Sequence, residues 1–117
     1  MTRDDFDAYC GSLTGTSHVV QWGGSSVWKV GGKIFAICSP WGKGDDQKIS
    51  FKCSELSYQI LTELEGIIPA PYLARAKWVQ LARDDALSDG DIKSYIDDAH
   101  AIIAAKLTKK KRAEIGL

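Results

Sequence analysis

Apolar and polar residues alternate most regularly on either side of a Gly-Gly pair at positions 31 and 32. The stretch over residues 27–38 reads V-W-K-V-G-G-K-I-F-A-I-C. A two-residue loop of glycines allows positive φ at both positions, which the primed turn of a tight hairpin requires. The pattern therefore predicts a hairpin in which Trp28 pairs with Phe35 across the strands. One face carries the larger apolar residues Trp28, Val30, Phe35 and Ile37, and the other carries Val27, Lys29, Ile34, Ala36 and Cys38.

Three other stretches have the two-residue period of a strand, over residues 18–22, 48–53 and 78–82. In the first, Val20 and Trp22 share a face. In the second and third, the inward residues are Ile49, Phe51, Cys53, Val79 and Leu81, and the outward ones are Lys48, Ser50, Lys52, Trp78 and Gln80. Residues 39–46, which read S-P-W-G-K-G-D-D, are typical of a loop.

A period near 3.6 predicts three helices, each with a polar residue suited to its start. The first begins at Thr2, which with Asp5 resembles a capping box, and Gly15 ends it. The second follows Ser54, and the third follows Ser88. The stripe expected to be buried is Leu56, Ile60, Leu61 and Leu64 in the second helix, and Ile92, Tyr95, Ile96, Ala99, Ile103 and Leu107 in the third.

The resulting order is α-β-β-β-β-α-β-α, with short connections between the first four strands. This order predicts an α+β fold, a two-layer α/β sandwich with an antiparallel sheet of about five strands and helices on one face. A chain of 117 residues is expected to form a single domain over residues 1–117, ending in a basic tail at 108–117.

Charge and cysteine usage narrow the possible functions. Fifteen acids balance fifteen bases, which argues against strong non-specific attraction of the whole molecule to nucleic acid. Locally, residues 82–101 carry a net −4 and residues 102–117 a net +4. Three cysteines without a C-x-x-C pair favour a reduced, cytoplasmic protein whose thiols fill the core, with a reactive thiol as the alternative. We expect no secretory signal and no membrane span, because no apolar run is long enough.

Taken together, these segments resemble the MmcQ/YjbR family of small bacterial proteins. The matching pieces are T-R-D-D-F-D-A-Y-C near the start, V-W-K-V-G-G-K-I-F-A, I-S-F-K-C, P-A-P-Y-L before Trp78, and L-T-K-K-K-R-A near the end. The resemblance implies a two-layer fold similar to type III secretion chaperones, and it implies DNA binding, the label that members commonly carry. Many members read N-K-x-H-W before the last strand, whereas this chain has Ala74 and Lys77 at the Asn and His positions and keeps Trp78.

The outward strand positions give the predicted binding surface. Lysines around an aromatic residue suit a phosphate-bearing partner, because lysines neutralise phosphates and an indole stacks on bases. The alternative is a solvated sheet face whose lysine stems cover apolar surface. The basic tail either complements the dipole of the last helix or contacts nucleic acid. The predicted nucleic-acid-binding residues are Lys29, Lys52, Arg75, Lys77, Trp78, Lys109, Lys110, Lys111 and Arg112.

No motif in the sequence indicates a reaction, a metal site or a cofactor. His18 and His100 lack a Cys or carboxylate at metal-ligand spacing, and Cys53 lacks an evident base. We therefore predict a small non-enzymatic module that binds DNA weakly and in a salt-dependent way. The alternative is a protein-interaction or chaperone-like module with no role in nucleic-acid binding. Its partner in that case is another protein or a second copy of the same chain, in a homodimer.

Overall fold

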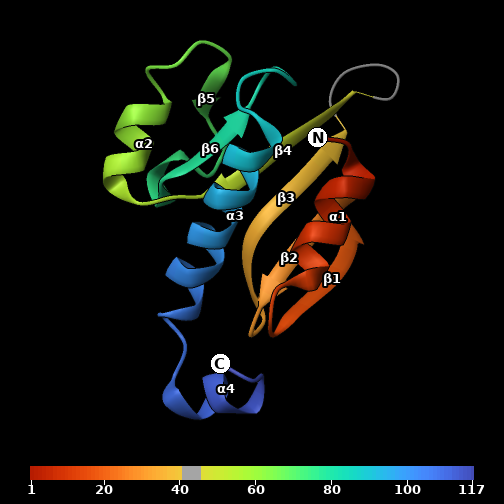
Figure 1. The fold of residues 1–117 in the computed structure, drawn as a ribbon, viewed down its shortest axis with the longest axis vertical. Coiled ribbons are helices and arrows are strands. Elements are labelled where there is room, and N and C mark those ends of the chain that lie inside the picture. The colour runs from red at the N-terminus through yellow and green to blue at the C-terminus, as the bar shows by residue number, and fades with distance from the viewer. Residues whose placement is uncertain (41–45) are drawn as a thin grey trace.

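The computed structural model of the protein describes residues 1–40 and 46–117. Six antiparallel strands form one sheet, in the order β1-β2-β3-β4-β6-β5 (Figure 1). The strands are β1 (Thr16–Gln21), β2 (Ser25–Val30), β3 (Lys33–Pro40), β4 (Gln47–Lys52), β5 (Ile67–Pro69) and β6 (Trp78–Leu81). The helices are α1 (Arg3–Ser12), α2 (Glu55–Leu61), α3 (Asp89–Ala104) and α4 (Lys109–Glu114), with a 3₁₀ turn η1 (Ala74–Ala76).

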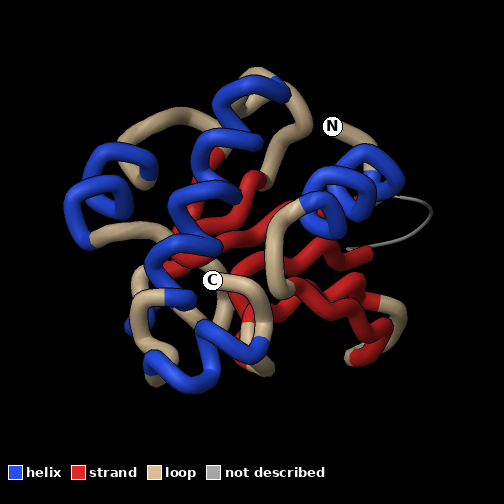
Figure 2. The backbone as a smooth tube through the Cα atoms, turned by 60° about the horizontal axis from the view of Figure 1, so that its bottom comes forward, coloured by secondary structure: helices blue, strands red, loops and turns tan. Residues whose placement is uncertain are grey.

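The main helices cover one face of the sheet, so the predicted α+β fold is confirmed. In Figure 2, α1 and α3 lie on the near side of the strands. Phe6 of α1, Leu61 of α2 and Ile96 of α3 are buried in one core cluster with Phe51 and Val79 of the sheet. Two elements were not predicted, the short edge strand β5 and the helix α4.

The predicted helix starts are confirmed at three places. The Thr2 hydroxyl accepts from the Asp5 amide, and the Asp5 carboxylate accepts from the Thr2 amide, which completes a capping box. Ser54 caps α2 and Ser88 caps α3 in the same way, each with its side chain accepting a backbone N–H three residues later.

A β-bulge in the central hairpin makes the predicted pairing of Trp28 with Phe35 wrong. Val30 pairs with Lys33, and Lys29 with Ile34, as the turn requires, but Trp28 pairs with Ala36. Phe35 is therefore an extra residue on β3, and every position after it changes face. Ala36 and Cys38 join the core under the helices, whereas Ile37, predicted to lie there, is on the opposite face of the sheet.

Two other predicted apolar faces are wrong in part. Of the stripe expected to be buried on α2, Leu61 is buried, but Leu56, Ile60 and Leu64 are exposed, because α2 lies at the margin of the sheet beside the edge strand β5. The first strand ends at Gln21 and leaves Trp22 in the turn that follows, 62% exposed. The predicted loop at 39–46 falls partly on β3 and partly outside the described residues.

For the helix dipole to favour the basic run, the run would have to continue the third helix. It does not. α3 ends at Ala104, and the chain turns back to start α4, whose N-cap is Thr108. Lys109 and Lys110 therefore lie in the first turn of α4, where the helix dipole is unfavourable for cations, whereas Lys111 and Arg112 belong to its last turn. α4 lies at the same end of the molecule as the turn between β2 and β3 (Figure 1).

Candidate functional site: a groove on the open sheet face

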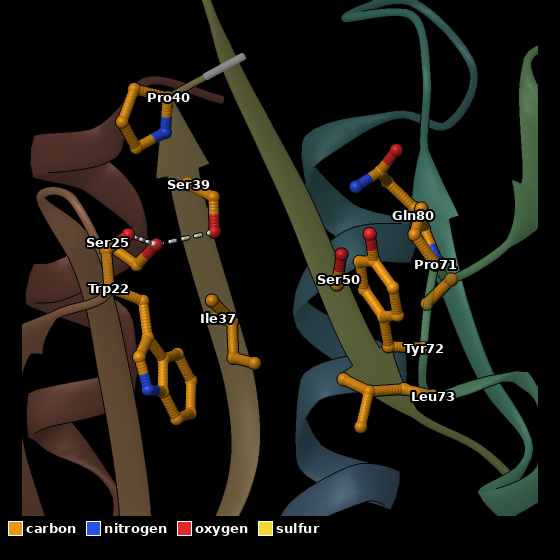
Figure 3. Close-up of a pocket in the computed structure, with 11 residues that line it drawn as sticks. Trp22, Ser25, Ile37, Ser39, Pro40, Ser50, Pro71, Tyr72, Leu73 and Gln80 are labelled. Atoms are coloured by element: carbon orange, nitrogen blue, oxygen red, sulfur yellow. Dashed lines mark hydrogen bonds between the residues drawn. The ribbon is translucent and has the colours of Figure 1, made fainter.

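The sheet face opposite the helices is only half covered. The segment from Ala70 to η1 packs on it and buries Trp78 beside Val27 and Ile37. Next to this covered part lies a groove of about 490 Å³, within the range typical of ligand sites. The groove is bordered by Trp22 and Tyr72, and its floor includes Ile37, Ser39, Ser50 and Gln80 (Figure 3). None of the described residues that line it is charged.

Trp22 forms one side of the groove because of the turn between β1 and β2. The turn reads Trp22-Gly23-Gly24, and all three residues have positive φ, at 53°, 73° and 99°. The glycines adopt such values freely, but a bulky side chain at positive φ is a genuine outlier. The turn places the indole in solvent beside the sheet rather than in the core.

Tyr72 borders the other side from a tight turn. The Leu73 amide donates to the Ala70 carbonyl at 3.1 Å, which closes a four-residue turn with Pro71 and Tyr72 at its centre. Tyr72 has a φ of 68° at the third position of the turn, where type II turns favour glycine. Its side chain is fully exposed. The two aromatic residues of the groove are thus two of only three non-glycine residues with positive φ in the described chain.

The floor of the groove is polar although it is buried. Gln80 and Ser50 are directly opposite each other on β6 and β4, and each is less than 8% exposed. Beside them, the Ser25 hydroxyl lies 2.9 Å from the Ser39 hydroxyl and 3.3 Å from the Trp22 carbonyl oxygen, and it hydrogen-bonds with both. The Gln80 amide and the Ser50 hydroxyl therefore supply polar groups at the base of an otherwise apolar groove.

The structure places Trp78 on the predicted open face, but it does not leave the indole free to stack. Trp78 is only 5% exposed, because Ala70 and Leu73 pack over it. Lys52 lies directly opposite Trp78 on β4, and its ammonium donates to the Ala76 carbonyl. Partial burial, helped by the nearby positive charges of Lys106 and Lys77, lowers the pKa of Lys52.

The other predicted nucleic-acid-binding residues are spread over several elements. Lys77 has its ammonium 4.9 Å from the centre of the Tyr58 ring, and Arg75 is exposed on η1. Lys29 is half-buried on β2, opposite Ile34. The basic run forms α4, with Lys109, Lys110 and Lys111 exposed and Arg112 half-buried. Lys52 is thus near enough to Lys77 and to Lys106, a residue the sequence analysis did not select, to feel their charges, and none of the three lines the groove.

One cluster that the sequence analysis missed contains serine, histidine and aspartate. The Ser26 hydroxyl donates to the Asp7 carboxylate at 2.5 Å, and His18 Nε2 lies 2.7 Å from the same hydroxyl. Since the single hydroxyl proton goes to Asp7, His18 Nε2 must carry the proton of the second bond. The imidazole is then a donor to Ser26 and not its base, and Ser26 is fully buried. With the Trp28 indole also donating to Asp7, the cluster ties α1 to β1 and β2.

The three thiols are buried and unactivated. Burial raises the pKa of Cys38 and of Cys53 to about 11, and it raises the pKa of Cys10 further. Cys53 also donates to the Lys77 carbonyl. A thiol with a raised pKa is a poor nucleophile at neutral pH, so these residues act as core side chains.

Within residues 1–40 and 46–117, no helix has the length and apolar character to cross a membrane. In the same part of the chain, no three His, Cys, Asp or Glu side chains lie close enough together to hold a metal ion.

Comparisons with known proteins concern the family and the fold. The YjbR family model matches residues 11–102. The crystal structure of Deinococcus radiodurans protein DR2400, with a DUF419 domain, has a TM-score of 0.86 and 22% identity, covering 99% of this chain and 88% of that one. A crystal structure of a Pseudomonas syringae protein has a TM-score of 0.71 and 21% identity, covering 88% of this chain and 99% of that one. No curated protein sequence matches the chain.

Proposed function

The chain belongs to the YjbR family. From that premise, we propose that it is a non-enzymatic protein-interaction module. The groove on its open sheet face binds an extended segment of a partner protein. The observation that carries the proposal is the pair of strained, exposed aromatic residues, Trp22 and Tyr72, on opposite sides of an uncharged groove. Exposed aromatic residues around a concave apolar surface are typical of interaction sites.

The groove favours a polypeptide over a nucleic acid for an electrostatic reason. Binding a nucleic acid depends mainly on cations that neutralise phosphates. The described residues of the groove supply none, and the indole of Trp78 is covered. Tyr72 is fully exposed and Trp22 is 62% exposed, so both aromatic rings are accessible to a partner.

Selection from a displayed library of random peptides tests this proposal. We expect the protein to enrich peptides that bind the wild type and fail to bind a Trp22→Ala/Tyr72→Ala double variant. Leu56→Ala is a matched control, because Leu56 is exposed to a similar extent on α2 but lies outside the groove. If every enriched peptide binds the double variant as well as the wild type, the groove is not the interaction site.

Nucleic-acid binding is the second candidate, and a different surface favours it. Lys52 lies near enough to Lys77 and Lys106 to feel their charges, and the exposed lysines of α4 follow Lys106 within a few residues of the sequence. If about four phosphates are neutralised there, log K should fall against log salt with a slope near −3 to −4. Truncation after Leu107 should remove the α4 share of that slope. Absence of binding to DNA and RNA at low salt would eliminate this candidate.

The absence of an enzymatic activity, the cytoplasmic location and the possibility of a homodimer remain predictions. Sedimentation equilibrium over a range of protein concentrations measures homodimer formation directly. A concentration-independent monomer mass would exclude the homodimer and leave the groove for a different partner.

A further inference from the structure

The two edges of the sheet differ in how they are protected. β1 and β5 are the outer strands, and each pairs with one neighbour. β5 has three residues, ends in Pro69 and has α2 beside it, all of which are usual ways to keep an edge strand from pairing. β1 has none of these protections. It runs for six residues without Pro, Lys, Arg, Asp or Glu, and its register with β2 has no bulge.

The free edge of β1 presents backbone groups that suit another strand. In the outer strand of an antiparallel sheet, alternate N–H and C=O groups point away from the neighbouring strand. In the part of the chain that the structure describes, no other backbone group bonds to residues 17–21 outside the ladder with β2. Figure 1 shows β1 as the outermost strand on its side of the sheet. The partner that satisfies this row of groups together is a further β-strand.

A second copy of β1 fits this edge. Antiparallel pairing about a two-fold axis normal to the sheet keeps the helices of both copies on one side. Because faces alternate along a strand, the axis must pass through a residue and not between two. The strand has no acidic or basic residue besides His18, and an axis through Val19 keeps the two imidazoles from lying opposite each other.

The axis through Val19 also continues the packing of the open face. Val19 is half-buried against the cluster of Val27 and Ile37 on that face. With the axis there, Val19 lies opposite its own copy and adds a second valine to the cluster. On the other face Val20, which is 55% exposed, lies opposite His18 of the second copy. The pairing therefore removes apolar surface from water on both faces of the strand.

We infer that the protein forms a two-fold symmetric dimer in which two β1 strands pair through Val19 and join the two sheets into one. The interface is a single short strand from each copy, which is small for a stable complex, so the dimer is weak and depends on protein concentration. No residue of β1 lines the groove on the open face, so the dimer does not depend on the proposed peptide binding.

Paired charge variants test both the interface and its register. One variant is Ser17→Glu/Gln21→Glu and the other is Ser17→Lys/Gln21→Lys, because residues 17 and 21 lie opposite each other when the axis passes through Val19. Each variant alone places like charges together at two positions, and a mixture of the two places opposite charges there. Sedimentation equilibrium should show dimers of the wild type, an association constant at least about tenfold lower for each variant alone, and its recovery in the mixture.

The controls concern other surfaces and the folding of the variants. Ile68→Lys adds a charge to β5, the other edge, and Tyr72→Ala changes the groove; both should dimerise like the wild type. Ser17 lies opposite Lys29 on β2, so urea denaturation checks that the lysine variant is folded. If it is not, the glutamate variant still decides, because protonating its carboxylates at about pH 4 should restore its dimer relative to the wild type at that pH.

The results separate the dimer from the other interpretations. A wild-type mass that stays that of the monomer at every concentration overturns the inference and leaves the edge to a strand of a different protein. A dimer that persists in both charge variants, or that the mixture of folded variants does not restore, places the interface elsewhere. Failure of peptide selection at the groove contradicts the proposed function alone, since those peptides do not use β1.

Discussion

The contact between the central hairpin and the chain after α3 gives a quantitative test of the fold. Gly31 and Gly32 form the turn between β2 and β3, with φ values of 57° and 83°. A Cβ atom on Gly31 would lie 2.5 Å from a methyl carbon of Leu107, whereas a Cβ atom on Gly32 would have no neighbour within 4 Å. Gly31→Ala and Gly32→Ala therefore share the backbone strain but differ in the steric contact.

The expected magnitudes follow from these two terms. Alanine at positive φ costs about 1–2 kcal/mol, and the loss of glycine's freedom in the unfolded chain offsets about 0.4–1 kcal/mol. Gly32→Ala should then lower the free energy of unfolding by about 1 kcal/mol. Gly31→Ala adds overpacking against Leu107, typically about 1–3 kcal/mol, for a total of about 2–4 kcal/mol.

Urea denaturation of the two variants, with Leu107→Ala and the Gly31→Ala/Leu107→Ala double variant, measures both terms. Removing the Leu107 side chain should relieve the clash, so the double variant should be more stable than the sum of the single effects predicts, by about 1–3 kcal/mol. Equal destabilisation by Gly31→Ala and Gly32→Ala, within about 0.5 kcal/mol, would show that Leu107 does not pack on the turn.

Three further predictions concern a turn residue, a buried cluster and the thiols. Tyr72→Gly should be no less stable than the wild type in urea, because the φ of Tyr72 costs about 1–2 kcal/mol that glycine avoids; a loss above about 1 kcal/mol would contradict the strain. Asp7→Ala should destabilise the protein by about 1–3 kcal/mol, since the buried Ser26 hydroxyl loses its acceptor, and an unchanged urea midpoint would refute this role. Burial raises the pKa of Cys38 and Cys53 from 9.0 to about 11, which favours the neutral thiols in the folded state. The free energy of unfolding should therefore keep its full value below pH 9 and fall as the pH rises toward 11. Replacing Cys38 and Cys53 by alanine should make this alkaline decline shallower in urea titrations at each pH, with Cys10 keeping its own share, and an equally steep decline would exclude these two thiols as a cause.

Features set by neighbours along the chain could be predicted from the sequence. The capping box of Thr2 and Asp5, the two-glycine turn and the faces of β4 and β6 are as expected, because each depends on a few consecutive residues. A turn or a cap has one favourable local geometry, and a strand without irregularities has a fixed period of two.

The features that define the groove could not be predicted in this way. The sequence analysis placed Trp22 on a strand and used P-A-P-Y-L only for the family resemblance, so it missed both aromatic residues of the groove. The weak signal was an aromatic residue after Pro71, at a turn position that normally favours glycine. The bulge at Phe35 was equally hidden, because one extra residue on β3 is stabilised by the packing of both strands under the helices.

A local pattern of apolar and polar residues indicates the face on which a side chain lies, but not whether that face is covered. Alternation indicates which residues share a face, and it placed Trp78 and Gln80 together on the side without helices. It does not indicate what covers that face. The segment from Ala70 to η1 packs on Trp78 and leaves Gln80 at the floor of an open groove, and α2 lies so far to the edge that most of its apolar stripe stays in solvent. Burial depends on contacts between residues distant in the sequence, so only the tertiary structure decides it.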